Sequence, residues 1–154
     1  MSTAHPTLII GSDHAGFLLK EYLRGQLSNS HTTVDVGCYS EDSVDYPRIA
    51  SALSSGLLQH VQPAFGILLC GSGNGVCMSA NRFQGIRAAL CWNVEIATLA
   101  RLHNNANVLC LPARFLDQEV AWNIVQAFLE TPFEGGRHLR RIELIKNVNS
   151  IEGP

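Results

Sequence analysis

The sequence predicts a single doubly wound, Rossmann-like α/β domain in which helices cover both faces of a five-stranded parallel sheet. Short apolar segments alternate about five times with segments whose apolar residues recur at helical spacing. The apolar segments contain few polar residues, which is typical of parallel strands that are buried on both faces. A chain of 154 residues suits one domain, and we expect residues 1–154 to form it.

The first half of the chain is predicted to contain three strands and two helices. Each strand is a short apolar run, and each helix has leucine or isoleucine every four residues. The second helix follows a polar loop and begins near Pro47, because proline is favoured in the first helical turn. The expected elements are a strand at 8–10, a helix around Leu19, Leu23 and Leu27, a strand at 34–36, a helix around Ile49, Leu53 and Leu57, and a strand at 65–69.

The second half is predicted to contain two strands and four helices. Its first helix is short and follows a glycine-rich loop at 71–75, and its last helix follows the segment TPFEGGR. The expected elements are a helix at 76–83, a strand at 86–91, a helix at 94–102, a strand at 108–111, a helix around Val120, Ile124, Val125 and Phe128, and a helix marked by Leu139, Ile142, Ile145 and Val148.

Composition and charge exclude several kinds of partner. The chain is 46% hydrophobic and 16% charged, with a formal net charge of −2, so it has no general attraction to nucleic acid or to an anionic membrane. No apolar stretch approaches the ~18 residues of a membrane-spanning helix. The N-terminal segment MSTAHPTLII lacks the basic start and long apolar core of a signal peptide. We therefore expect a cytoplasmic protein without a nucleic-acid or membrane partner.

The chain has five cysteines, and their spacings match neither a zinc pattern nor C-x-x-C. We expect reduced thiols, with Cys38, Cys77, Cys91 and Cys110 serving as small apolar residues of the interior. Cys70 differs because it ends a strand directly before the glycine-rich loop. No cluster of His, Cys and Asp has metal-ligand spacing, so we expect no metal site and no cofactor.

The first strand is followed by GSDHAG, which places Asp13 and His14 at a strand-to-helix turn. Ligands of doubly wound domains bind where the parallel strands end, so this turn is a candidate site. Asp13 could simply cap the following helix, which is a common role of aspartate. A histidine beside it is more than a cap needs, and both interpretations stay open.

The third strand is followed by CGSGNG, whose glycines Gly71, Gly73 and Gly75 let backbone amides turn inward. Together with a helix N-terminus, such amides form a cradle for an anion or an oxyanion. The loop lacks the lysine of a P-loop, and it has neither the spacing nor the position of a dinucleotide-binding loop. A tight glycine turn without a ligand is the alternative.

Cys70 directly precedes this cradle, and that setting favours the thiolate. The thiolate could attack a carbonyl while the cradle holds a tetrahedral oxyanion. It could instead remove a proton beside a carbonyl while the cradle holds an enediolate. Ser72 can donate a hydrogen bond in either reaction.

Polar and basic residues follow the later elements. His103 and Asn104 lie where a helix ends and the fifth strand begins, and Arg114 follows that strand. Arg137 and Arg141 are four residues apart and share a helical face. The alternatives without a ligand are that the histidine only interacts with the helix dipole and that the arginines only face solvent. Two arginines and a histidine would nevertheless suit a phosphate dianion.

These motifs together resemble the ribose-5-phosphate isomerase B family, whose relatives act on allose and galactose 6-phosphates. The resemblance covers nearly the whole chain and rests on GSDHAGFLLKEYL, DYP, CGSGNG, SANRFQGIRAALC, ARLHNNANVLC and EGGRHLRRIELI. It implies the alternating α/β fold predicted above. It also implies a homodimer, or a tetramer, with sites formed across a subunit interface.

The resemblance implies a role for each candidate residue. Cys70 corresponds to the base that moves a proton between C1 and C2, and His103 to the acid that helps open the furanose ring. Ser72 belongs to the enediolate cradle with the loop residues Gly71, Gly73, Asn74 and Gly75. The binding residues are Asp13 and Asn104 for sugar hydroxyls, His14, Arg114, Arg137 and Arg141 for the phosphate, and Tyr46 as a residue that lines the site.

One departure from the family affects the choice of base. Some members lack a cysteine at the position of Cys70 and have a glutamate directly after GSGNG, where this chain has Val76. Many members with the cysteine have threonine in place of Ser72, which keeps the hydroxyl. Because valine cannot accept a proton, Cys70 is the candidate base of this loop.

We therefore expect a metal-free aldose–ketose isomerase that interconverts ribose 5-phosphate and ribulose 5-phosphate through an enediolate. The alternative within the same class is an isomerase of a hexose 6-phosphate such as allose or galactose 6-phosphate. The alternatives from other classes are a thiol acyl-transfer enzyme and a sugar-phosphate sensor without catalysis.

Overall fold

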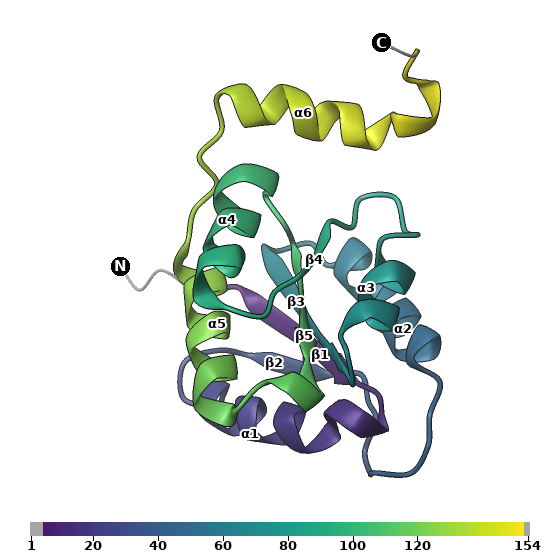
Figure 1. Ribbon diagram of the computed structural model, residues 1–154, viewed down its shortest axis with the longest axis vertical. Coiled ribbons are helices and arrows are strands. Elements are labelled where there is room, and N and C mark those ends of the chain that lie inside the picture. Colours follow the sequence, from purple (N-terminus) through teal and green to yellow (C-terminus); the bar gives the residue numbers. More distant parts are fainter. Residues whose placement is uncertain (1–4, 153–154) are drawn as a thin grey trace.

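Residues 5–152 are described by a computed structural model, and they are organised around a parallel sheet with the strand order β2-β1-β3-β5-β4 (Figure 1). Every neighbouring pair of strands runs parallel. The carboxyl ends of the strands therefore lie along one edge of the sheet and the amino ends along the other. The strands are β1 (Thr7–Ser12), β2 (Thr33–Asp35), β3 (Ala64–Cys70), β4 (Ala88–Leu90) and β5 (Val108–Pro112).

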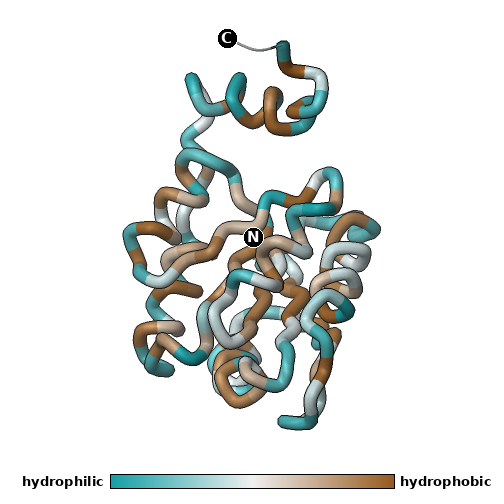
Figure 2. The backbone as a smooth tube through the Cα atoms, turned by 45° about the vertical axis from the view of Figure 1, so that its right-hand side comes forward, coloured by the Kyte–Doolittle hydropathy of each residue, from teal (hydrophilic) through white to brown (hydrophobic). Residues whose placement is uncertain are grey.

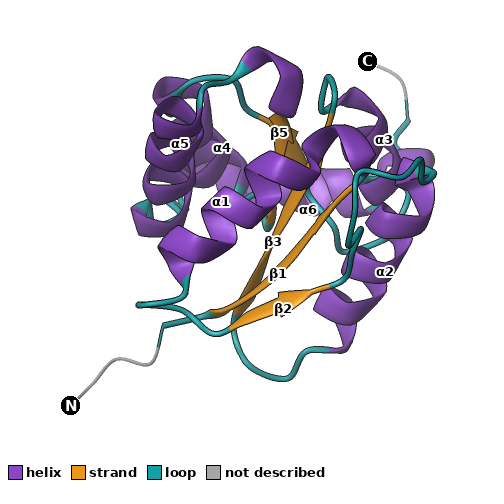
Figure 3. Cartoon of the chain, turned by 90° about the horizontal axis from the view of Figure 1, so that it is seen from below, coloured by secondary structure: helices purple, strands orange, loops and turns teal. Residues whose placement is uncertain are grey.

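Helices cover both faces of the sheet, as Figure 3 shows. One layer contains α1 (Phe17–Leu27), α4 (Val94–Asn104) and α5 (Gln118–Glu130), and the other contains α2 (Tyr46–Gln59) and α3 (Asn74–Ala80). The predicted doubly wound fold is confirmed, and residues 1–4 and 153–154 of the predicted domain lie outside the described part. Within residues 5–152, no helix has both the length and the apolar character needed to cross a bilayer.

The strands divide their side chains between two hydrophobic cores. In β3, Ile67 and Leu69 pack into the core with α1, α4 and α5, whereas Leu68 and Cys70 pack into the core with α2 and α3. This alternation follows from the two-residue period of a strand. It explains why the strands are apolar throughout, and it places the Cys70 side chain on the face that α2 and α3 cover.

Two elements have other bounds than the sequence predicts. The α3 helix covers Asn74–Ala80 instead of 76–83: it starts early because Gly73, with a left-handed φ of 75°, is its N-cap, and it ends early with Asn81 as its C-cap. The β4 strand covers Ala88–Leu90 instead of 86–91. Its ladder begins only at residue 88, since the N–H of Arg87 donates to the side-chain Oδ1 of Asn107 at 2.7 Å rather than to a neighbouring strand.

The last predicted helix, α6 (Arg137–Lys146), lies apart from both helical layers (Figures 1 and 2). Ile142 is buried with 4% exposure, but Leu139 and Ile145 are 53% and 49% exposed, and Val148 in the following 3₁₀ turn is 61% exposed. The helical spacing is therefore confirmed, while most of its apolar residues are not covered by their own chain.

A buried lysine holds the long loop between β2 and α2. The Lys20 ammonium has no exposed side-chain surface and donates to both carboxylate oxygens of Asp35, at 2.8 and 2.7 Å, and to the carbonyl of Cys38 at 2.7 Å. The rings of Phe17 and Tyr39 lie about 5.5 and 5.4 Å from its nitrogen. Lys20 thus links α1, β2 and the loop that leads to Tyr46.

Replacing Lys20 with methionine should destabilise the protein by about 3 kcal/mol, because Asp35 would lose its buried partner and the Cys38 carbonyl its donor. Arg24→Met is the matched control, since Arg24 also contacts Asp35, at 3.1 Å, but is 36% exposed and should contribute at most about 1 kcal/mol. Urea unfolding measures both changes. Equal losses in the two variants would contradict the assignment of Lys20 as the link that holds the loop.

Candidate active site

A pocket of about 470 Å³ opens at the carboxyl edge of the sheet, where β1, β3 and β5 end. Seven of the predicted site residues line it and so lie together in the structure. Phe115 was not predicted. It directly follows Arg114 and is 75% exposed. The sequence signal that could have found it is an aromatic residue shortly after a buried strand. The lining residues are Asp13, Tyr46, Cys70, Gly71, Ser72, Gly75, Arg114 and Phe115.

Cys70 is the last residue of β3, and its side chain is buried with 4% exposure. Two contacts hold the loop after β1 against the end of β3. The Asp13 N–H donates to the Leu69 carbonyl at 3.1 Å, and a Cβ on Gly16 would lie only 2.7 Å from the Cβ of Leu69. The sheet and these contacts position the thiol, which therefore does not depend on a mobile loop.

The glycine loop turns directly after Cys70. Gly73 has a φ of 75°, and a Cβ there would meet the Leu90 side chain and lie 3.1 Å from the Leu111 carbonyl carbon. The Ser72 hydroxyl oxygen accepts hydrogen bonds from the Asn74 backbone N–H at 3.3 Å and from its side-chain amide at 3.2 Å. Because that oxygen is the acceptor in both bonds, the hydroxyl proton is left to donate to a ligand.

Two side chains pack directly on glycines of this loop. A Cβ on Gly75 would lie 2.6 Å from ring carbons of Tyr46, and a Cβ on Gly71 would lie 3.1 Å from the Arg114 guanidinium. The Arg114 N–H also donates to the Gly71 carbonyl at 3.0 Å. The glycines therefore allow an aromatic ring and a guanidinium to approach the loop backbone, which brings a positive charge to the pocket that Cys70 lines.

Asp13 lines the pocket and also caps a 3₁₀ turn at His14–Gly16. Its Oδ1 accepts from the N–H groups of Ala15 and Gly16 at 3.0 and 3.2 Å. The capping role of Asp13 is thus confirmed, and its position in the pocket is compatible with a contact to a ligand as well. The Nδ1 atom of His14 accepts from the Val44 N–H at 3.3 Å, so the neutral ring has its proton on Nε2. His14 is not among the residues that line the pocket.

Four predicted site residues lie elsewhere in this chain. His103 and Asn104 form the last turn of α4, just before β5 begins at Val108, and Arg137 lies at the start of α6. Because β5 is parallel to β3, this end of α4 lies at the amino edge of the sheet. The seven residues of β3 separate the two edges by roughly 20 Å. One chain therefore does not bring His103, Asn104, Arg137 and Arg141 to Cys70.

At the amino edge His103 stacks on His138, with ring centroids 4.3 Å apart and planes at 13°. The Nε2 atoms of His103 and His138 lie 3.7 and 3.5 Å from the same oxygen of Glu134, and the Arg137 side chain donates to His138 at 3.4 Å. Burial lowers the pKa of His138, and the neighbouring His103 and Arg137 lower it further. The sequence analysis missed Glu134 and His138, although their spacing of four residues within EGGRH could have identified them.

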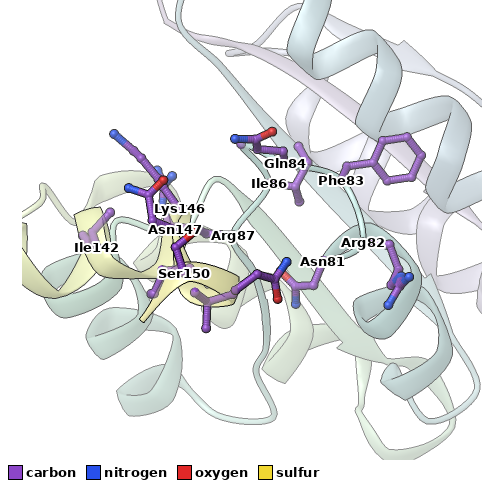
Figure 4. A pocket seen from close by; sticks show the side chains of 14 residues that line it. Asn81, Arg82, Phe83, Gln84, Ile86, Arg87, Ile142, Lys146, Asn147 and Ser150 are labelled. Carbon is purple, nitrogen blue, oxygen red and sulfur yellow. The ribbon is translucent and has the colours of Figure 1, made fainter. Parts of the chain in front are cut away.

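Two arginines that were not predicted hold the end of α4. Arg101 is buried with 7% exposure, and its side chain donates to the Asn105 side chain at 3.0 Å and to the Ala106 carbonyl. The Arg87 side chain donates to the carbonyls of Asn104 and Asn105 at 3.1 and 3.0 Å. Arg87 also lines a second pocket, of about 400 Å³, between α6 and the segment after α3 (Figure 4). Cations at the carbonyl end of a helix are favourable, and here they fix the turn that contains His103.

The remaining cysteines are unpaired thiols. Cys38, Cys91 and Cys110 are buried as predicted, and burial raises the pKa of Cys91 to about 12 and that of Cys110 well above its ordinary value. Cys77 is only half buried, and a hydrogen bond from Cys110 lowers its pKa.

The doubly wound fold, with a thiol, a hydroxyl, a carboxylate and a guanidinium gathered at the carboxyl edge, defines a class of α/β enzymes that act on small molecules. The model of the ribose/galactose isomerase family matches residues 8–145, and the chain belongs to this family. It is accordingly an aldose–ketose isomerase, as the motifs predicted.

Curated relatives and solved structures agree with this assignment. The chain is 43% identical over 140 residues to a probable ribose-5-phosphate isomerase B of Mycoplasma genitalium, covering 90% of this chain and 92% of that protein. It is 39% identical to ribose-5-phosphate isomerase B of Escherichia coli, covering 92% and 95%. The crystal structure of a ribose 5-phosphate isomerase from Thermotoga maritima superposes with a TM-score of 0.90 at 50% identity, covering 93% and 99%. The Mycoplasma genitalium enzyme with bound ribulose 5-phosphate also superposes with a TM-score of 0.90, at 40% identity, covering 97% and 99%.

Gly73→Ala should disrupt the loop, because alanine is strained at a φ of 75° and its Cβ would collide with Leu90. We expect a loss of more than about 1 kcal/mol in stability and a fall of roughly 100-fold in turnover. Gly25→Ala in α1 is the control, since nothing lies within 4 Å of its added Cβ and it should gain about 0.5 kcal/mol. Thermal unfolding and turnover are measured together, and a fully active Gly73→Ala variant would contradict the role given to the loop backbone.

Proposed function

We propose that this chain interconverts ribose 5-phosphate and ribulose 5-phosphate, with Cys70 as the base. The observation that carries the proposal is the position of Cys70, which ends β3 in one pocket with Ser72, Asp13 and Arg114. Relatives named as ribose-5-phosphate isomerase B support the substrate, and so does the relative solved with ribulose 5-phosphate.

In the proposed reaction the Cys70 thiolate removes the proton from C2 of the open-chain aldose. The electrons move to the carbonyl oxygen and form an enediolate, which the loop amides and the free hydroxyl proton of Ser72 stabilise. A proton also moves from O2 to O1, so that the C2 hydroxyl becomes the carbonyl, and the thiol returns the first proton to C1. No proton is gained or lost overall. General base catalysis of this kind contributes roughly 10²–10⁴-fold to the rate. Val76 is buried in the apolar core behind the loop and offers no alternative base.

The other predicted residues complete the site only if a second copy of the chain supplies them. His103 would protonate the ring oxygen, Asn104 would bind a sugar hydroxyl, and Arg137 and Arg141 would bind the phosphate, yet all lie at the far edge of their own sheet. We infer that they act in the pocket of a partner subunit, in a homodimer. The exposed apolar residues Leu139, Ile145 and Val148 support this inference, because a second copy would cover them.

The substrate is tested by measuring turnover of ribose, allose and galactose phosphates side by side, since pocket size determines whether a sugar with one additional carbon fits. A preference for a hexose 6-phosphate would replace the substrate and keep the reaction class. We also propose a cytoplasmic location, which the five unpaired cysteines support.

Cys70→Ala should bind sugar phosphate but lose exchange of the C2 proton with solvent, because neither Val76 nor Ser72 accepts a proton at neutral pH. Nuclear magnetic resonance of ribulose 5-phosphate and ribose 5-phosphate in D₂O measures the incorporation of deuterium from the solvent. Cys38→Ala, at another buried cysteine, is the control and should exchange as the wild type does. Exchange by Cys70→Ala near the wild-type rate would exclude Cys70 as the base.

Two inactive variants should restore each other if the site spans two subunits. In a Cys70→Ala and His103→Asn mixture, each heterodimer has one site with both native residues and one with neither. The variants are co-expressed with different affinity tags, and the purified doubly tagged dimer is assayed. One of its two sites has both native residues, so it should have about half of the wild-type activity. If the doubly tagged dimer has no activity, either Cys70 and His103 of the same chain form one site or another residue opens the ring.

A further inference from the structure

Outside the pocket, three metal-ligating side chains face one another at the amino edge of the sheet. The ligand atoms of His103, Glu134 and His138 all lie within 4.8 Å of one another. Both imidazole Nε2 atoms lie near the same carboxylate oxygen, at 3.7 and 3.5 Å. The three residues come from the end of α4, the following loop and the start of α6, so the fold and not a local sequence motif creates the group.

The backbone around this group is held in place. The Glu134 N–H donates to the Leu102 carbonyl at 3.1 Å, which ties the loop to the last turn of α4. Gly135 and Gly136, with φ of 72° and 56°, then reverse the chain so that His138 returns over Glu134. His138 is buried with 4% exposure, and its ring is stacked on that of His103. Three potential ligands are therefore presented together without a conformational change of the backbone.

The two imidazole–carboxylate distances are close to those of a tetrahedral transition-metal site, and the stacked rings of His103 and His138 must rotate out of their near-parallel arrangement for both Nε2 atoms to meet one ion. Zinc binds imidazole nitrogen at 2.0–2.1 Å and carboxylate oxygen at 2.0–2.2 Å, so two ligands of one tetrahedral ion are about 3.4 Å apart. The observed separations of 3.7 and 3.5 Å need to shorten by only a few tenths of an ångström. Two histidines with one carboxylate form a donor set that favours zinc, copper, nickel or cobalt over magnesium or calcium.

We propose that His103, Glu134 and His138 bind a divalent transition-metal ion of the zinc type, and that the ion inhibits the isomerase. The inhibition rests on the proposed function, because a metal on His103 Nε2 occupies the atom that would protonate the ring oxygen. The ion must also displace the Arg137 side chain, which donates to His138 at 3.4 Å, and so withdraws a predicted phosphate ligand.

Binding is tested directly by titrating the full-length protein with Co²⁺, whose visible absorption reports a site of low coordination number. The Cys70→Ala protein is titrated in parallel, so that metal binding to that thiol is excluded and no activity is needed. Both proteins should bind one Co²⁺ per chain without the near-ultraviolet band of thiolate ligation. Glu134→Gln should weaken binding by roughly 10- to 100-fold. Glu130→Gln is the matched control, since Glu130 is exposed and forms no ion pair within residues 5–152.

Inhibition is tested with Zn²⁺ against ribose 5-phosphate. The concentration for half inhibition should rise at least about tenfold in Glu134→Gln and stay unchanged in Glu130→Gln, each relative to its own metal-free rate. The metal site would be overturned if the wild-type protein bound no Co²⁺, or if Glu134→Gln bound Co²⁺ as tightly as the wild type. Neither result depends on enzyme activity. If Zn²⁺ bound without inhibiting turnover, the inhibitory role would be wrong and the metal site itself would stand. If the protein failed to turn over ribose 5-phosphate, the Co²⁺ titration would still decide the metal site.

Discussion

The parallel register of β3 between β1 and β5 is the constraint on which the site depends. Ser12 in β1 pairs with Leu69, and Cys70 pairs with Pro112 in β5, so the three strands end at one level. The residues that follow them, Asp13, Gly71 and Arg114, are thereby brought to one pocket although they lie far apart in the sequence. A slip of one residue in β3 would exchange its two faces and move the Cys70 thiol to the α1 and α5 side of the sheet.

Much of this arrangement could be predicted because the controlling signals are local. Apolar segments and helical spacing place every strand and the main helices, and the rule that ligands bind at the carboxyl edge then selects Asp13, Cys70, Ser72 and Arg114. Element ends were less predictable because single contacts set them. A left-handed Gly73 starts α3 early, and the side chain of Asn107 takes the Arg87 N–H that a longer β4 would have used.

The division of the predicted site residues between two edges does not follow from the motifs themselves, although the order of elements, with His103 and Asn104 just before the fifth strand, indicates it. ARLHNNAN and EGGRH point to the same chemistry as CGSGNG, and nothing in their composition says that a sheet separates them. The supporting residues were missed for a related reason. Arg101 and Arg87 act through backbone carbonyls, and Glu134 and His138 act through a contact with α4, so their roles exist only once the amino edge is assembled.

The shortness of β2 and β4 has a consequence for how this protein behaves in a crowded solution. These two strands form the outer edges of the sheet and have three residues each. A short edge presents few unpaired N–H and C=O groups to another chain, and this discourages the open-ended strand addition that leads to fibres. The apolar side chains that α6 exposes lie on a helix, whose backbone groups are paired within it, so neither this surface nor the sheet edges offer another chain a long unpaired strand.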